Sequence, residues 1–198
     1  MLLQIRTSGV ATELMHPTGT GAGASVALTG LASAFARPAT AADRLPAAFT
    51  AHTAPDSGLP YDSRRVATYV DGKHRHWNLY IFKQRLHGKV NVCEYLVRDA
   101  GGGGGCSPSS AFFARGRQVA ATEGRLFAGV ASAKVARVEV VGSRGVVHNV
   151  PLSADHSFIY DCNAYNGCVC VVAKLRAYDQ QGTLVTNQRW LGPRCRTH

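Results

Sequence analysis

Residues 135–190 alternate short apolar runs with turn-forming residues, and this pattern limits the possible folds more than any other feature of the sequence. The first run reads V-A-R-V-E-V-V, in which Arg137 and Glu139 alternate with valines. A two-residue period is typical of a β-strand with one buried and one solvent-facing side. Five such runs in all, at spacings of roughly 8–12 residues, indicate a small antiparallel sandwich or barrel. We therefore predict an all-β fold, with an antiparallel sandwich module over residues 123–198.

A second strand-rich region, residues 64–122, precedes this module. Asp71-Gly72 separates two β-prone runs and predicts a hairpin, because type I′ turns need positive φ at both central residues. A further strand-like run over 89–99 ends at consecutive glycines. Without side chains to pack, these glycines predict a flexible loop. They are Gly101, Gly102, Gly103, Gly104 and Gly105.

The region before residue 64 holds little that can form a core. Residues 1–41 contain a mildly apolar run of small residues and end at small-x-small sequences such as Ala39-Thr40-Ala41, which predicts a signal peptide or leader. The basic n-region is weak, so a disordered Ala/Gly tail and a membrane anchor stay open as alternatives. Residues 42–63 carry three prolines without periodicity and predict an extended linker.

The chain has six cysteines, and none of them lies in the predicted leader. An even number in an exported protein predicts disulfide bonds, although their connectivity cannot be read from the sequence. One candidate bridge joins the two cysteines that flank the glycine run, and closing a loop of that size stabilises by about 3 kcal/mol. A metal site at the later cysteines is the rival interpretation. The disulfide candidates are Cys93, Cys106, Cys162, Cys168, Cys170 and Cys195.

The formal net charge of +10 favours contact with an anionic surface. Anionic envelope polymer and anionic lipid are the partners expected from this charge. The arginines are scattered and form no dense basic run, so specific nucleic-acid binding is not expected.

The sequence contains no recognisable catalytic pattern. Asp155-His156-Ser157 names the members of a hydrolase triad, but adjacent residues point in divergent directions and cannot form the relay. Two histidines and two aromatic residues near the predicted hairpin are candidates for a surface-binding site, with core packing as the alternative for the rings. These residues are His74, His76, Trp77 and Tyr80. We predict no catalytic residue, cofactor or metal ligand.

A resemblance supports the prediction of fold and export. The run G-V-A-S-A-K-V-A-R-V-E-V-V-G-S-R-G-V-V-H-N-V-P-L, followed by F-I-Y and L-R-A-Y-D-Q-Q-G-T-L-V, resembles a module of uncharacterised exported proteins of high-GC Gram-positive bacteria. That module implies an immunoglobulin-like β-sandwich. The match extends from Phe127 to Trp190 and consists of strand and turn positions, so it implies no catalytic or binding residue.

These observations together predict an exported, disulfide-stabilised protein, extracellular or in the cell envelope, with a binding or structural role. A small secreted enzyme or enzyme inhibitor that uses the 74–95 hairpin is one alternative. Such a protein would show a concave site with convergent polar groups near His74, His76 or Glu94. A nucleic-acid binder is a second alternative, and it would gather its arginines on one face. The sequence leaves the oligomeric state open.

Overall fold

The computed structural model describes residues 34–47, 58–98, 101–109, 111–113, 119–123, 126–142, 145–161 and 172–189. The elements bounded within these ranges are eleven β-strands and one 3-10 turn, η1 (Ala41–Asp43). Their strand pairs are antiparallel, so the predicted all-β antiparallel fold is confirmed. Within the described ranges, no helix has the length and apolar character needed to cross a bilayer.

The first four strands form one sheet, here called the N-terminal sheet, in which each strand pairs with the next along the chain. This order follows from the short connections between them, because antiparallel neighbours can be joined by tight hairpins. The strands are β1 (Tyr61–Val70), β2 (His76–Leu86), β3 (Lys89–Arg98) and β4 (Gly101–Pro108). Strand β1 starts within the stretch that the sequence assigned to a linker, directly after Pro60, where a proline interrupts no ladder.

The prediction of a flexible loop at Gly101 to Gly105 is wrong, because these glycines form most of β4 and pair with β3. The missing side chains allow an unusually close approach of the two strands. A Cβ atom on Gly102 would lie 2.6 Å from the Leu96 carbonyl oxygen, and one on Gly104 would overlap the Glu94 carbonyl oxygen. Glycine is therefore required at these two positions by the pairing itself.

The β1–β2 hairpin is confirmed, but its turn is longer than the predicted two-residue turn. Val70 pairs with His76, which leaves five residues, 71–75, in the connection. The Asp71 carboxylate accepts hydrogen bonds from the backbone N–H groups of Lys73 and Arg75 at 2.9 and 3.1 Å. The left-handed residue is His74, with φ of 57°. Side-chain capping by Asp71 thus replaces the type I′ turn that the Asp-Gly dipeptide predicted.

Seven further strands form two sheets. Strands β5 (Val119–Glu123), β6 (Phe127–Ala131) and β9 (Ser157–Tyr160) make the middle sheet, in the order β5-β6-β9. Strands β7 (Arg137–Gly142), β8 (Val147–Val150), β10 (Val172–Tyr178) and β11 (Leu184–Arg189) make the outer sheet, in the order β11-β10-β7-β8. The short runs of the C-terminal sequence are thus strands, as predicted.

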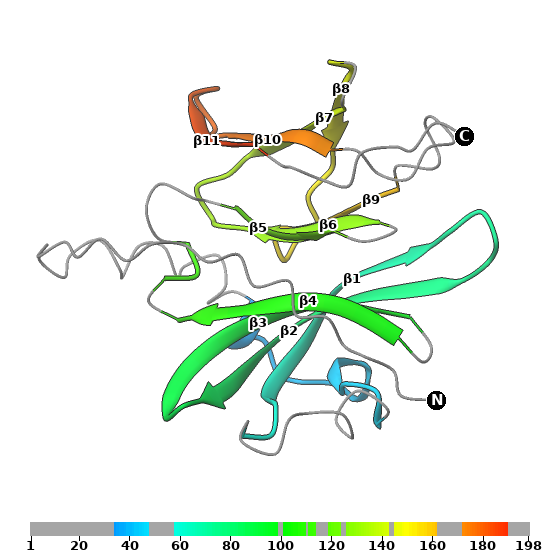
Figure 1. The fold of residues 1–198 in the computed structure, drawn as a ribbon, viewed down its shortest axis with the longest axis vertical. Coiled ribbons are helices and arrows are strands. Elements are labelled where there is room, and N and C mark those ends of the chain that lie inside the picture. The colour runs from blue at the N-terminus through cyan, green and yellow to red at the C-terminus, as the bar shows by residue number, and fades with distance from the viewer. Residues whose placement is uncertain are drawn as a thin grey trace, which may run out of the picture.

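The three sheets are layered, with the middle sheet between the other two (Figure 1). Strand β6 shows why: all five of its residues are buried, and they alternate between two hydrophobic clusters. Phe127 and Ala131 pack towards the outer sheet, whereas Ala128 and Val130 pack towards the N-terminal sheet. Because successive side chains point to opposite faces, the middle sheet contributes to both cores.

Residues 34–47, here called the N-terminal strap, pack across the edge of β1. Ala34 is 1% exposed and lies in the cluster between the N-terminal and middle sheets, while Leu45 packs against the opposite face of the N-terminal sheet. Arg37 donates to both carboxylate oxygens of the buried Asp43, at 2.8 and 2.7 Å. The last residues of the predicted leader and the first of the predicted linker are therefore part of the packed structure.

Candidate functional site

The outward face of the outer sheet gathers basic side chains. Val138 and Val140 of β7, and Leu175 and Ala177 of β10, point into the core between the outer and middle sheets. The alternate residues of these strands therefore point away from the core. We call this surface the cationic face; its cations are Arg137, Lys174, Arg176 and Arg189.

The strand register arranges these residues in rows across the sheet. Tyr178 pairs with Arg137, and Arg176 pairs with Glu139. The Arg137 guanidinium lies 4.2 Å from the centre of the Tyr178 ring, and the Tyr178 hydroxyl donates to Glu139 Oε2 at 2.9 Å. Arg137 also forms an ion pair with Glu139 at 3.2 Å. This part of the face is thus held in place by contacts within the chain.

The third row places two positive charges opposite each other. Lys174 pairs with Arg189 across β10 and β11, so the two side chains share the outward face. Like charges directly opposite on neighbouring strands are destabilising. Within the described residues neither side chain forms a salt bridge, since the one carboxylate of the face, Glu139, contacts Arg137 and Arg176 instead. An anion bound between Lys174 and Arg189 would relieve their repulsion.

The chemistry of this face suits an anionic polymer. The Arg137 side chain is 49% exposed and that of Arg176 is 33% exposed, so both keep donors available to solvent. Guanidinium groups bind phosphate and carboxylate oxygens through paired N–H donors, and the lysine adds a compact positive charge. A sheet face also presents its cations in a plane at regular strand spacings of about 4.8 Å, which fits a repeating array of charges rather than one small ion.

The four surface-binding candidates do not form one site. Trp77 and Tyr80 are 8% and 4% exposed, and they belong to clusters on opposite faces of the N-terminal sheet. His74 lies in the β1–β2 turn and His76 starts β2, and both are exposed. Among the described residues, no group of three or more His, Cys, Asp or Glu side chains is arranged to hold a metal ion.

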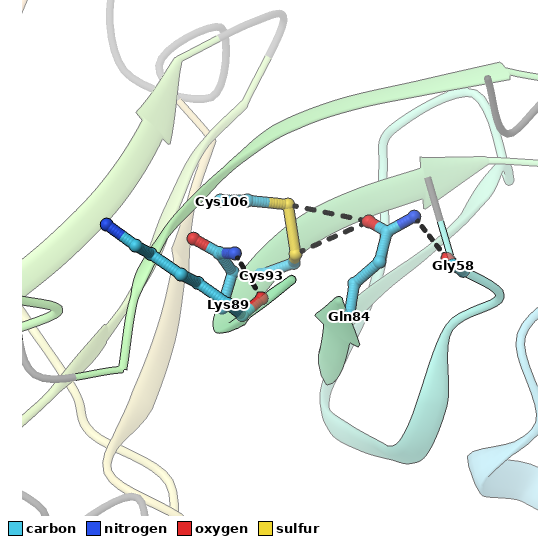
Figure 2. The surroundings of a disulfide bond; sticks show 6 residues. Gly58, Gln84, Lys89, Cys93 and Cys106 are labelled. Atoms are coloured by element: carbon cyan, nitrogen blue, oxygen red, sulfur yellow. Dashed lines mark hydrogen bonds between the residues drawn. A yellow bond between two sulfur atoms is a disulfide. The ribbon is translucent and has the colours of Figure 1, made fainter. Parts of the chain in front are cut away.

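The disulfide predicted across the glycine run is present: Cys93 and Cys106 face each other on β3 and β4 and are bonded. The Gln84 amide oxygen lies 3.8 Å from both sulfurs, and its amide nitrogen donates to the Gly58 carbonyl at 2.9 Å (Figure 2). The bridge is thus tied to β2 and to the chain that enters β1. The predicted partners Cys162, Cys168, Cys170 and Cys195 lie outside the described residues.

Glu94 is buried between the N-terminal and middle sheets. It is 6% exposed, shares its face of β3 with Val92 and Leu96, and has no hydrogen-bond partner for Oε2. Burial raises its pKa to about 8, because the charged form loses its hydration. A raised carboxyl pKa is common at active sites, but a catalytic group also needs a cavity with convergent polar groups.

A polar hollow is present between the strap and β1, away from Glu94. It has a volume of about 470 Å³ and is lined by the strap and β1, including Thr40, Arg44, Asp62 and Ser63. None of His74, His76 and Glu94 lines it. The Asp155-His156-Ser157 turn is likewise used structurally, since Ser157 Oγ donates to the Val66 carbonyl at 2.6 Å and Asp155 pairs with Arg37.

Comparisons with known proteins leave the site to be argued from its own geometry. The chain matches no protein-family model, and comparisons with curated proteins and with solved structures give no match. The immunoglobulin-like identity of the C-terminal module therefore stays a prediction.

Proposed function

We propose that this protein is a non-enzymatic binding module of the cell envelope that holds an anionic polymer on its cationic face. The observation that carries the proposal is the unneutralised pair Lys174 and Arg189, placed opposite each other on the outward side of the outer sheet. Such a pair opposes folding unless a ligand compensates it. Binding is the function that explains why both charges stand there.

Three further features support an extracellular setting. The Cys93–Cys106 disulfide is typical of proteins that fold outside the cytosol. The N-terminal part of the sequence has the composition of a leader. The net charge of +10 gives long-range attraction to wall polymer or lipid phosphate. Export and envelope location are part of the proposal.

The strand order supports the immunoglobulin-like prediction for the module from β5 to β11. Numbered along this module, strands one, two and five form one sheet, and strands three, four, six and seven form the other. Constant-type immunoglobulin domains differ from this order only in the sheet to which the fourth strand belongs. Binding through an exposed sheet face is compatible with that architecture.

The test compares two double variants that remove equal charge. Lys174→Gln with Arg189→Gln removes the opposed pair, whereas Arg85→Gln with Lys89→Gln removes two exposed cations from the N-terminal sheet. Binding of each protein to immobilised polyphosphate and to vesicles containing phosphatidylglycerol is measured at low ionic strength. We expect the first variant to lose about tenfold in affinity for polyphosphate and the control to lose much less.

Equal losses in the two variants would show that only net charge matters and would overturn the assignment to the cationic face. Binding to vesicles but not to polyphosphate would assign the face to a lipid surface instead. Absence of binding to both would remove the proposed function altogether.

A further inference from the structure

Strand β4 ends the N-terminal sheet with an exposed main-chain edge. Gly101 to Gly105 are all exposed, and β4 is the last strand in the sheet order. Apart from the ladder to β3, no backbone hydrogen bond of these five residues is found in the described part of the chain. With respect to the described residues, the outward N–H and C=O groups of β4 are therefore open to pairing with another strand.

The strap covers the β1 edge of the N-terminal sheet, whereas the β4 edge has no such cover among the described residues. On β1, the Arg65 N–H donates to the Asp43 carboxylate at 2.8 Å and the Arg65 carbonyl accepts from Arg37 at 3.1 Å. The strap thus satisfies outward backbone groups of that edge. Proteins usually cover or charge exposed edges to prevent pairing. Strand β4 carries no charged residue and, among the described residues, no such cover.

The glycines of β4 fall into two groups. Pairing with β3 requires Gly102 and Gly104, as described above, but a Cβ atom on Gly101, Gly103 or Gly105 would meet nothing within 4 Å. Alternate positions of a strand point to opposite faces of the sheet, so these positions share the face of their β3 partners, which for Gly103 and Gly105 are Leu96 and Glu94. Packing within this chain does not explain why they lack side chains. Close approach of another main chain does, whereas glycines that serve no contact only weaken a strand.

A buried polar group beside β4 gives an independent indication of a ligand. Glu94 pairs with Gly105, so no side chain of β4 lies next to its carboxyl group. Its Oε2 atom is buried without a hydrogen-bond partner. An unsatisfied buried polar atom is unfavourable by about 1–3 kcal/mol. Because Oε2 is shielded from solvent in the free protein, a side chain of an added strand would supply the missing partner only if the groups that cover this atom shift on binding.

We propose that the β4 edge binds an extended peptide segment of a partner protein by strand addition, so that the peptide becomes the fifth strand of the N-terminal sheet. Main-chain hydrogen bonds to Gly101 to Gly105 provide the affinity in this mode of recognition. The disulfide to Cys93 holds β4 in its extended form at one end of the glycine run, so the edge is ordered before the peptide arrives.

The occupant is a peptide rather than a second copy of this chain. Two facing β4 strands of eight residues, five of them without side chains, bury far less than the roughly 1,200–2,000 Å² of a stable interface. Two copies that each carry a charge of +10 also repel one another. An extended segment with acidic residues at its ends has complementary charge and needs only the strand edge.

The experiment uses a fluorescent peptide of alternating threonine and alanine with a glutamate at each end. Its affinity for the wild-type protein, Gly103→Lys and Gly72→Lys is measured by anisotropy. Both substitutions add a lysine where nothing lies within 4 Å, so they match in charge and in local space. We expect Gly103→Lys to weaken binding about tenfold and Gly72→Lys to leave it unchanged or slightly stronger. Added positive charge alone would strengthen binding of this peptide.

A second measurement does not depend on a variant that folds. The same peptide, N-methylated at every residue, lacks main-chain donors on both of its edges and is expected not to bind. Equal binding of the methylated peptide, equal binding by the two lysine variants, or no binding to wild type up to about millimolar concentration would overturn the proposal. A concentration-dependent dimer that Gly103→Lys abolishes would assign the edge to a second copy instead. Polyphosphate binding is expected to be unchanged in Gly103→Lys, which separates this proposal from the cationic face.

Discussion

Replacement of Glu94 by glutamine should make the protein more stable at alkaline pH and change little in acid. In the folded protein burial raises the pKa of Glu94 to about 8, from an ordinary value of 4.5. Folding therefore binds a proton between these two pH values, and stability falls as the pH rises. Below pH 4.5 both states are protonated, so the full stability is present there. Above about pH 8 both states are ionised, and the loss is complete.

The magnitude follows from the same two values. Each pH unit between them lowers the free energy of unfolding by about 1.4 kcal/mol, which gives a total of roughly 5 kcal/mol across the window. This is a large part of the 5–15 kcal/mol that is usual for a domain. Glutamine keeps the shape of the side chain but does not titrate, so Glu94→Gln avoids this loss.

Urea unfolding of the wild type and of Glu94→Gln, followed by circular dichroism from about pH 5 to about pH 8.5, measures the difference directly. We expect the variant to gain stability relative to the wild type with rising pH and the difference to level off above about pH 8. Parallel curves would refute the reasoning, because they would mean that Glu94 is already ionised and hydrated in the folded state. Asp43→Asn should show the opposite pH dependence. The Arg37 guanidinium holds the pKa of Asp43 below its ordinary value, so the stability that Asp43 contributes is lost as the pH falls.

Three further outcomes follow from the described contacts. Lys174→Gln alone should weaken polyphosphate binding and should leave the free energy of unfolding unchanged or raise it by up to about 1 kcal/mol. A clear decrease in melting temperature would contradict the repulsion between Lys174 and Arg189. Replacing both Cys93 and Cys106 by serine should lower the free energy of unfolding by about 3 kcal/mol. Reduction should then lower the stability of the wild type by about 3 kcal/mol more than that of the variant, and an unchanged denaturation midpoint of the variant would argue against the bridge. A chain that starts at Ala42 lacks Arg37, so the buried Asp43 carboxylate loses its ion pair. We expect it to be less stable by about 3–5 kcal/mol than a chain that starts at Ala34. Equal stability would mean that the fold does not need residues 34–41.

Local sequence patterns predicted the strands well because their signal lies within each strand. Val138 and Val140 alternate with charged residues and sit on the core side of β7, as the two-residue period indicates. The glycine run was assigned wrongly because its order comes from β3 and from the Cys93–Cys106 bridge, neither of which is local. A disulfide between Cys93 and Cys106 brings the two ends of the segment between them together. The cysteine spacing was therefore compatible with a strand beside β3, although the glycine content favoured a loop.

The candidate site could not be fully predicted from the sequence, because it is formed by strands that pair through the sheet register. Lys174 and Arg189 come from different strands, and only the register of β10 and β11 places them face to face. Alternation of Lys174 and Arg176 with apolar residues is visible in the sequence, so a cationic strand face was predictable, whereas the unneutralised pair was not. Trp77 and Tyr80 show the converse: alternation puts them on opposite faces, and both faces of the N-terminal sheet are covered.

The dependence of polyphosphate affinity on salt concentration distinguishes direct contact at the cationic face from attraction by net charge alone. Cations that contact a polyanion release counterions, so the logarithm of the affinity falls linearly with the logarithm of the salt concentration. We expect a steep negative slope for the wild type, a slope that is shallower by about two for Lys174→Gln with Arg189→Gln, and an unchanged slope for Arg85→Gln with Lys89→Gln. A flat salt response of the wild type, or the same slope in all three proteins, would contradict direct contact at the cationic face.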